Sequence, residues 1–297
     1  MHGYNYLKTS FHEYLQQQDM TKKSIGSCEK VIRLFLTWLE NQNVEPECTS
    51  YTDVLGYMKH CQKKGMTQRT VQNYLNMIRH LYDHLIEQEQ VEINPVTGIK
   101  VQGVKRKTLH SIFQPNELNA LYNNYQDKGL KGKRNKVMLG LLVYQGLKTE
   151  ELARLDEKDV KLKEGKIEIQ GSRKSNARTL QLESHQVLEM YDYTLQVRKE
   201  ILTGSGEKTD KLLVSIEGGS GVPNHITQMM LKLRKQNELV VNAKQLRASV
   251  ISKWLKQYNL RQVQYLAGHR YISSTESYQQ NEMEGLTEEV NRFHPLG

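Results

Sequence analysis

The sequence has 297 residues, a formal net charge of +9 and three cysteines that lie far apart along the chain. This length allows two domains, and the positive charge favours a polyanionic partner, with nucleic acid ahead of an anionic membrane. Isolated thiols argue against a disulfide framework or a zinc site and suit a reducing compartment. Because no stretch has the apolar length of a membrane span or a signal peptide, we expect a cytoplasmic protein.

The first 95 residues carry four stretches in which apolar residues recur at helical spacing. These stretches cover residues 4–18, 25–42, 52–65 and 67–85. Their candidate starts include Thr21, Thr52-Asp53, and either Thr67 or Thr70. Four such helices with short connections predict a helical bundle over residues 1–95. The bundle ends at Asn94-Pro95, because the residue before a proline is biased away from helix.

Residues 96–112 differ from what precedes them, because they hold two glycines and no acidic residue. Their basic cluster consists of Lys100, Lys105, Arg106 and Lys107. This composition predicts an exposed linker with a basic face. A solvated linker and a linker that contacts phosphates are both open at this point.

Residues 113–297 mix helical and strand-like patterns. Helices are expected from Gln114-Pro115 onward and over residues 137–144, 185–201, 224–236, 243–257, 260–267 and 283–293. Residues 160–162, 166–169 and 179–182 alternate between apolar and polar, which predicts a small antiparallel sheet. A further short strand is expected over residues 212–215. The chain is therefore expected to be mainly α with a small antiparallel sheet, as a helical domain followed by an α+β domain.

A Gly-His pair near the end of the chain marks a junction between two helical stretches. Gly268 can end the first, because glycine accepts the left-handed conformation found just past a helix C-terminus. Ser273, Ser274 or Thr275 could cap the second. His269 then lies at the junction, and Tyr278 follows nine positions later, two to three turns into the next helix.

The candidate reactive residues of the second domain are cations and one hydroxyl nucleophile. They are Lys148, Lys174, Lys244, Arg247, His269 and Tyr278. The sequence has no phosphate-binding P-loop, zinc-protease motif or serine-hydrolase elbow. Cationic side chains can bind the non-bridging oxygens of a phosphodiester, a tyrosine hydroxyl can attack the phosphorus, and a lysine can protonate the leaving oxygen. This set predicts phosphodiester chemistry that requires neither a metal nor a cofactor.

Four segments together resemble the tyrosine recombinases, the phage integrase family, in the two-domain layout of Xer-type enzymes. Residues 266–278, with L-A-G-H, S-S-T and the tyrosine, look like the family's L-G-H…T-T…Y box. The K-Q-L-R at residues 244–247 looks like its H-x-L-R box, and G-L-K-T-E-E-L at residues 146–152 looks like its G-L-R-x-x-E-L box. Residues 173–178 are similar to the turn that carries the family's lysine. The resemblance covers nearly the whole chain.

Two positions depart from the family pattern, and the hairpin is ambiguous. Lys148 stands where the first arginine usually is, which keeps the charge but loses the planar two-pronged clamp on phosphate. Lys244 replaces the more frequent histidine. In the hairpin, Arg173 falls nearest the usual lysine position, yet Lys174 is the only lysine of the turn. We favour Lys174, because an arginine almost never releases a proton.

The resemblance implies a site-specific DNA recombinase or integrase with a SAM-like core-DNA-binding domain (residues 1–95) and a catalytic domain (residues 113–297). Tyr278 would form a 3′-phosphotyrosyl bond, and Lys174 would protonate the leaving 5′ oxygen. The phosphate would be held by Arg247, Lys148, Lys244 and His269. The family works as a homo-tetramer on paired duplex sites and passes through a Holliday junction, with the C-terminal helix, here residues 283–293, docked on a neighbouring subunit.

Two other interpretations stay open. One is a catalytically weak or inactive relative that binds DNA as a regulator, which the lysine at position 148 motivates. The other is a nicking-closing enzyme that resembles the type IB topoisomerases, which shares the chemistry but not the pairing of two sites.

Overall fold

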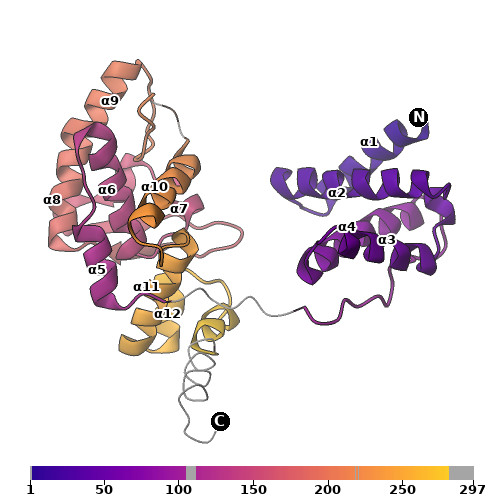
Figure 1. The fold of residues 1–297 in the computed structure, drawn as a ribbon. Coiled ribbons are helices and arrows are strands. Elements are labelled where there is room, and N and C mark those ends of the chain that lie inside the picture. Colours follow the sequence, from indigo (N-terminus) through magenta and orange to yellow (C-terminus); the bar gives the residue numbers. More distant parts are fainter. Residues whose placement is uncertain (1, 105–111, 218, 220, 281–297) are drawn as a thin grey trace, which may run out of the picture. The chain divides into compact units, whose positions relative to one another are not determined.

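The computed structural model describes residues 2–104, 112–217, 219 and 221–280, and it divides the chain into two compact units. The first unit is Met1–Lys107 and the second is Thr108–Gly297 (Figure 1). Each unit has its own hydrophobic core. Within the described ranges, no helix is long and apolar enough to cross a membrane.

In the part of the first unit that the structure describes, residues 2–104, there are four α-helices. They are α1 (His2–Gln17), α2 (Lys22–Asn41), α3 (Tyr51–Lys63) and α4 (Gln68–Glu87), with a short 3₁₀ turn at Pro46–Cys48. The Thr21 and Thr67 hydroxyls cap α2 and α4 by accepting a hydrogen bond from the amide three residues on. The third helix begins at Tyr51 and not at Thr52, and Ser50 caps it: the Ser50 hydroxyl accepts from the Asp53 amide and the Asp53 carboxylate accepts from the Ser50 amide.

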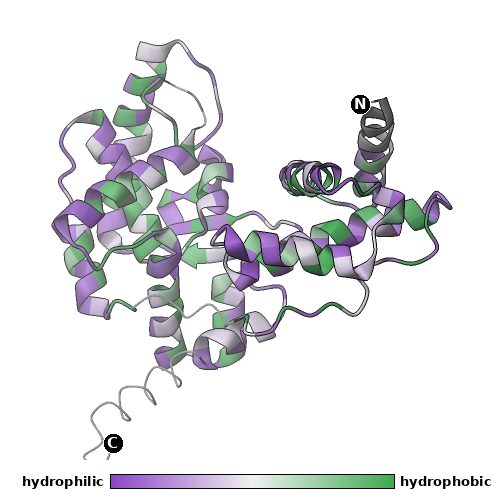
Figure 2. Ribbon diagram, turned by 45° about the vertical axis from the view of Figure 1, so that its right-hand side comes forward, coloured by the Kyte–Doolittle hydropathy of each residue, from purple (hydrophilic) through white to green (hydrophobic). Residues whose placement is uncertain are grey.

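The core of this bundle forms where the apolar faces of the helices meet. Figure 2 shows hydrophobic positions in green and hydrophilic positions in purple along the same helices. The ring of Phe35 meets the ring of Tyr57 edge-on, with their centroids 4.9 Å apart. Val96 and Ile99 are buried in this core, so these two residues of the expected linker pack on the bundle, while Thr97 and Gly98 between them are exposed. Lys100 is exposed, and the other three basic residues of that cluster lie outside the described residues.

The second unit combines helices with a small sheet. The α-helices are α5 (Pro115–Asn123), α6 (Gly129–Val143), α7 (Thr149–Arg154), α8 (Ser184–Asp192), α9 (Arg198–Ser205), α10 (Val222–Gln236), α11 (Ala243–Gln257) and α12 (Leu260–Ala267). A π-helical segment, η4 (Tyr193–Val197), joins α8 to α9, so the single helix expected over residues 185–201 contains a π segment. Residues 273–280 are helical as well, and the helix expected over residues 283–293 lies outside the described residues.

The expected antiparallel sheet is confirmed. It consists of β1 (Val160–Lys161), β2 (Lys166–Ile169) and β3 (Arg178–Gln181), in the order β1-β2-β3. Ile167 pairs with Leu180, and both side chains enter the core of the unit. The turn between β2 and β3 carries Arg173 and Lys174.

The strand expected over residues 212–215 is wrong. In a strand, the backbone hydrogen bonds of these residues would be made with a neighbouring strand. Here they are made with side chains and with a loop carbonyl. The Leu212 amide donates to the Leu155 carbonyl, and the Leu212 carbonyl accepts from the Tyr193 hydroxyl. The Val214 carbonyl accepts from the buried Arg134 guanidinium. The apolar run is therefore buried without belonging to the sheet.

Candidate active site

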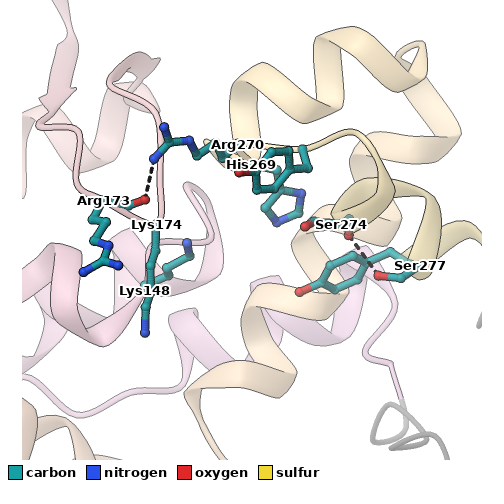
Figure 3. A pocket seen from close by; sticks show the side chains of 9 residues that line it. Lys148, Arg173, Lys174, His269, Arg270, Ser274 and Ser277 are labelled. Carbon is teal, nitrogen blue, oxygen red and sulfur yellow. Dashed lines mark hydrogen bonds between the residues drawn. The ribbon is translucent and has the colours of Figure 1, made fainter. Parts of the chain in front are cut away.

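A pocket of about 460 Å³ in the second unit collects four of the six candidate residues (Figure 3). Its lining consists of Lys148, Arg173, Lys174, His269, Arg270, Tyr271, Ser274, Ser277 and Tyr278. In Figure 3 the hairpin residues and Lys148 lie on one side of the pocket, and the two serines lie on the other. Several cations around one open cavity form a site that suits a phosphate group.

The junction that carries His269 has the expected glycine at the end of α12, but the helix that follows lacks the expected cap, because all three candidate residues lie inside it. Gly268 ends α12 with a φ of +62°, in the left-handed region that favours glycine. A Cβ at this position would also clash with the guanidinium of Arg178. The helical segment 273–280 contains Ser273, Ser274 and Thr275, and the Thr275 hydroxyl bonds the His269 ring, 2.9 Å from Nδ1.

Both ring nitrogens of His269 have partners. Nε2 lies 3.2 Å from Arg247 Nη2, and an arginine can only donate, so Nε2 accepts and Nδ1 carries the proton that it donates to Thr275. Burial, followed by the charges of Arg247 and Lys148, lowers the pKa of His269 to about 3. The ring is therefore neutral at physiological pH.

Tyr278 lies directly beside this histidine. The two rings are stacked, with centroids 5.7 Å apart and 16° between their planes. Tyr278 is half-buried, packs against the core of the unit and lines the pocket. The stacked histidine and the core thus hold the phenol at the pocket wall.

Arg247 lies behind the pocket, buried in α11. Its Nη1 donates to the Gly146 carbonyl and its Nη2 donates to the Ala267 carbonyl, each at 2.6 Å. Burial lowers the pKa of Arg247, and the negative charge of Glu151 opposes this shift. An arginine stays protonated even so. One guanidinium therefore joins the loop after α6, the end of α12 and the ring of His269.

A buried ion pair between Arg178 and Glu151 joins two elements next to the pocket. The Arg178 guanidinium donates two parallel hydrogen bonds to the Glu151 carboxylate, at 3.0 and 2.9 Å, and neither side chain is exposed. Glu151 also accepts from the Lys148 amide at 2.9 Å. Burial raises the pKa of Glu151, but the hydrogen bonds and charge of Arg178, with help from Arg247, outweigh burial and leave that pKa lowered. The carboxylate is thus charged and holds β3 against the start of α7.

Lys148 occupies the position just before α7 and is half-buried at the pocket. Burial, followed by the nearby charge of Arg247, lowers the pKa of Lys148. Lys244 behaves differently: it is exposed on α11 and is not among the residues that line the pocket. The structure therefore brings Lys148, Lys174, His269 and Tyr278 together, with Arg247 directly behind them, and places Lys244 outside.

Sequence reasoning missed two groups of residues. The first is Arg178, whose signal was a charged residue at a strand position that faces the core, two residues before the buried Leu180. The second is the part of the pocket lining made by Arg270, Tyr271, Ser274 and Ser277. These residues sit between His269 and Tyr278 in the sequence, or next to them, so their proximity was the available signal.

Comparisons with known proteins point to one family. The model of the phage integrase family matches residues 111–284, and the model of the phage integrase N-terminal SAM-like domain matches residues 9–89. Tyrosine recombinase XerC of Bacillus pumilus is 25% identical over 293 residues, which is 96% of this chain and 95% of the relative.

Two solved structures share the fold. The Tn1549 transposon integrase in complex with transposon right end DNA has a TM-score of 0.67 at 14% identity, over 95% of this chain and 99% of that one. A lambda integrase tetramer bound to a Holliday junction has a TM-score of 0.68 at 15% identity, over 92% of this chain and 76% of that one. The resemblance seen in the sequence is confirmed: the chain belongs to the phage integrase family of tyrosine recombinases.

Proposed function

We propose that this protein is a site-specific DNA recombinase that breaks and rejoins DNA through a phosphotyrosyl bond to Tyr278. The observation that carries the proposal is the stack of Tyr278 on a histidine that Arg247 holds, at the wall of a cationic pocket. A tyrosine beside cationic side chains is the arrangement that a metal-free phosphodiester transfer needs.

The proposed step is an in-line displacement at phosphorus. The phenol oxygen of Tyr278 forms a bond to phosphorus and its proton leaves to water, while the bond from phosphorus to the 5′ oxygen breaks. Lys174 gives its proton to that oxygen, which departs as a 5′-hydroxyl. The 5′-hydroxyl of a partner strand then attacks the 3′-phosphotyrosyl bond and reverses the step. The energy of the phosphodiester is kept in the covalent intermediate, so no nucleotide is consumed.

The other candidate residues receive binding roles. Arg247 and Lys148 stabilise the negative charge that develops on the non-bridging oxygens. His269 is neutral, so we assign it to holding Arg247 and Tyr278 in place at the phosphate site. Lys244 is exposed one turn before Arg247, and we assign it an outer contact with the DNA backbone.

The assembly is part of the proposal. The fold shared with a lambda integrase tetramer on a Holliday junction supports a homo-tetramer on two paired duplex sites. The net charge of +9 supports a duplex DNA partner. Residues 283–293 carry an apolar stripe of Leu286, Val290 and Phe293, which we assign to docking on a neighbouring protomer.

The test uses a duplex whose strand is nicked just 3′ of the scissile phosphate, so that the freed fragment diffuses away. Its sequence is the site selected by the protein from genomic DNA of the source organism. We expect an adduct that resists SDS with the wild type and none with Tyr278→Phe. Tight DNA binding without an adduct would contradict the recombinase and support a regulator. Relaxation of supercoiled DNA without exchange between two sites would support a nicking-closing enzyme.

A further inference from the structure

The hairpin between β2 and β3 is docked on the junction that carries His269. Residues Ser175 and His269 form an isolated antiparallel bridge. The Asn176 amide donates to the Gly268 carbonyl, and the Asn176 side chain donates to the His269 carbonyl, each at 3.2 Å. These contacts hold the base of the turn, one to two residues beyond Lys174.

The tip of the turn is held by a different residue. Nη1 of Arg270 donates to the main-chain carbonyl of Arg173 at 2.8 Å, and a dashed line in Figure 3 marks this bond. Arg270 is in turn fixed from α12, because the Gln264 amide group donates to the carbonyls of His269 and Arg270 at 3.3 and 3.4 Å. The Arg270 guanidinium therefore links the junction that carries His269 to the peptide that immediately precedes Lys174.

Lys174 itself is exposed at the pocket, on a turn of polar residues. A lysine side chain has a flexible four-carbon stem, so its reach to a given oxygen depends on where the turn is held. A displacement of about 1 Å in such a group costs on the order of 100-fold in rate. The bond from Arg270 to Arg173 acts at the point where such a displacement would begin.

We propose that Arg270 is a positioning residue that sets the β2–β3 hairpin at the pocket, so that the proton of Lys174 reaches the leaving 5′ oxygen. This inference rests on the proposed recombinase function. In the cleavage step the bond from Tyr278 to phosphorus forms and the bond from phosphorus to the 5′ oxygen breaks. The leaving oxygen takes its proton from Lys174, and the phenol proton goes to water. Of these events, Arg270 affects only the proton transfer from Lys174 to the leaving oxygen.

The test compares two nicked duplexes, one with the natural 5′ oxygen at the scissile phosphate and one with a bridging sulfur. A thiol has a pKa of about 8.5, so sulfur departs as a thiolate without receiving a proton. The variants are Arg270→Ala, Arg270→Lys and Lys174→Ala, with Arg154→Ala as the matched control. Arg154 is exposed at the end of α7, loses the same charge and is not part of the pocket lining. Adduct formation is followed at saturating DNA, with binding measured separately.

For Arg270→Ala we expect a loss of about 10- to 100-fold with oxygen and a loss of under about threefold with sulfur, in the same pattern as Lys174→Ala. Arg270→Lys keeps a cationic hydrogen-bond donor and should recover part of the oxygen rate, and Arg154→Ala should match the wild type on both duplexes. Equal losses on both duplexes, or no loss with oxygen, overturn the positioning role. If the wild type forms no adduct on both duplexes, the recombinase proposal itself is overturned.

Discussion

The ring of Tyr278 lies nearly parallel to the ring of His269, with 5.7 Å between centroids and 16° between planes. His269 is itself bonded to Arg247 on one side and Thr275 on the other. The orientation of the phenol is therefore linked to the guanidinium that we assign to the phosphate. The proposed nucleophile, Tyr278, is therefore in contact with the histidine that positions it, and the two residues can be substituted separately.

Tyr278→Phe removes the hydroxyl and leaves the ring stack. We expect adduct formation with nicked DNA to fall below detection, while DNA affinity and the melting temperature stay close to those of the wild type. Tyr265→Phe is the matched control, because Tyr265 is an exposed tyrosine whose hydroxyl accepts from the Thr179 amide outside the pocket lining. An adduct formed by Tyr278→Phe would place the nucleophile elsewhere.

His269→Gln tests the neutral histidine through the pH dependence of stability. The pKa of about 3 in the folded state lies below the ordinary value near 6.5, so the unfolded chain binds the proton more readily. The stabilising contribution is complete above about pH 6.5 and is lost as pH falls toward about 3. Removing the imidazole should make the unfolding free energy less steep in this window, by at most about 1.4 kcal/mol per pH unit.

The measurement is urea unfolding at several pH values between those limits. His60, His84 and His225 also have lowered pKa values and keep their share of the slope in the variant. An unchanged slope would mean that His269 is not held neutral by its surroundings.

Glu151→Gln tests the buried pair with Arg178. The glutamine keeps the shape but leaves the guanidinium without its counter-charge, and breaking a buried pair on one side costs about 3 to 5 kcal/mol. Glu150→Gln is the control, because Glu150 is exposed next to it and should change stability by no more than about 0.5 kcal/mol. Chemical denaturation measures both, and equal effects would contradict the structural role.

Gly268→Ala and Gly206→Ala separate two costs at helix ends. Both glycines cap a helix with positive φ, +62° at Gly268 and +71° at Gly206. A Cβ at Gly206 meets open space, so Gly206→Ala reports the left-handed strain alone, about 1 to 2 kcal/mol. A Cβ at Gly268 would also displace Arg178, so we expect a larger loss of stability together with a loss of adduct formation. Similar losses at the two positions would show that Arg178 can shift freely.

Much of the fold could be predicted because apolar residues recur at helical spacing, most clearly in α2, α4 and α12. The bounds expected for the helices at residues 243–257 and 260–267 match α11 and α12. Alternation likewise located the three paired strands. The run over residues 212–215 misled, because burial without alternation does not distinguish a strand from a coil held by buried side chains such as Tyr193.

Less of the site than of the fold could be predicted from the sequence. Motif spacing brought out His269 and Tyr278, which follow each other closely in the chain. The pairing of Glu151 with Arg178 joins residues 27 positions apart, and the bond from Arg270 to Arg173 joins residues 97 positions apart. Such partners depend on tertiary packing that a single sequence does not specify, which is also why the exposed position of Lys244 could not be foreseen.

Lys148→Arg tests the position where this chain departs from the family pattern. Arginine adds a planar fork that can bind two phosphate oxygens, so we expect adduct formation to rise, on the order of tenfold if one further charge-assisted bond forms. The lowered pKa of Lys148 also predicts that wild-type cleavage weakens earlier than that of Lys148→Arg as pH rises, since the amine loses its proton and the guanidinium does not. Single-turnover cleavage across pH measures both effects, with Lys163→Arg, an exposed lysine outside the pocket lining, as the control. A rate that is unchanged or lower at every pH would show that the pocket is built around lysine, with its phosphate clamp supplied by Arg247.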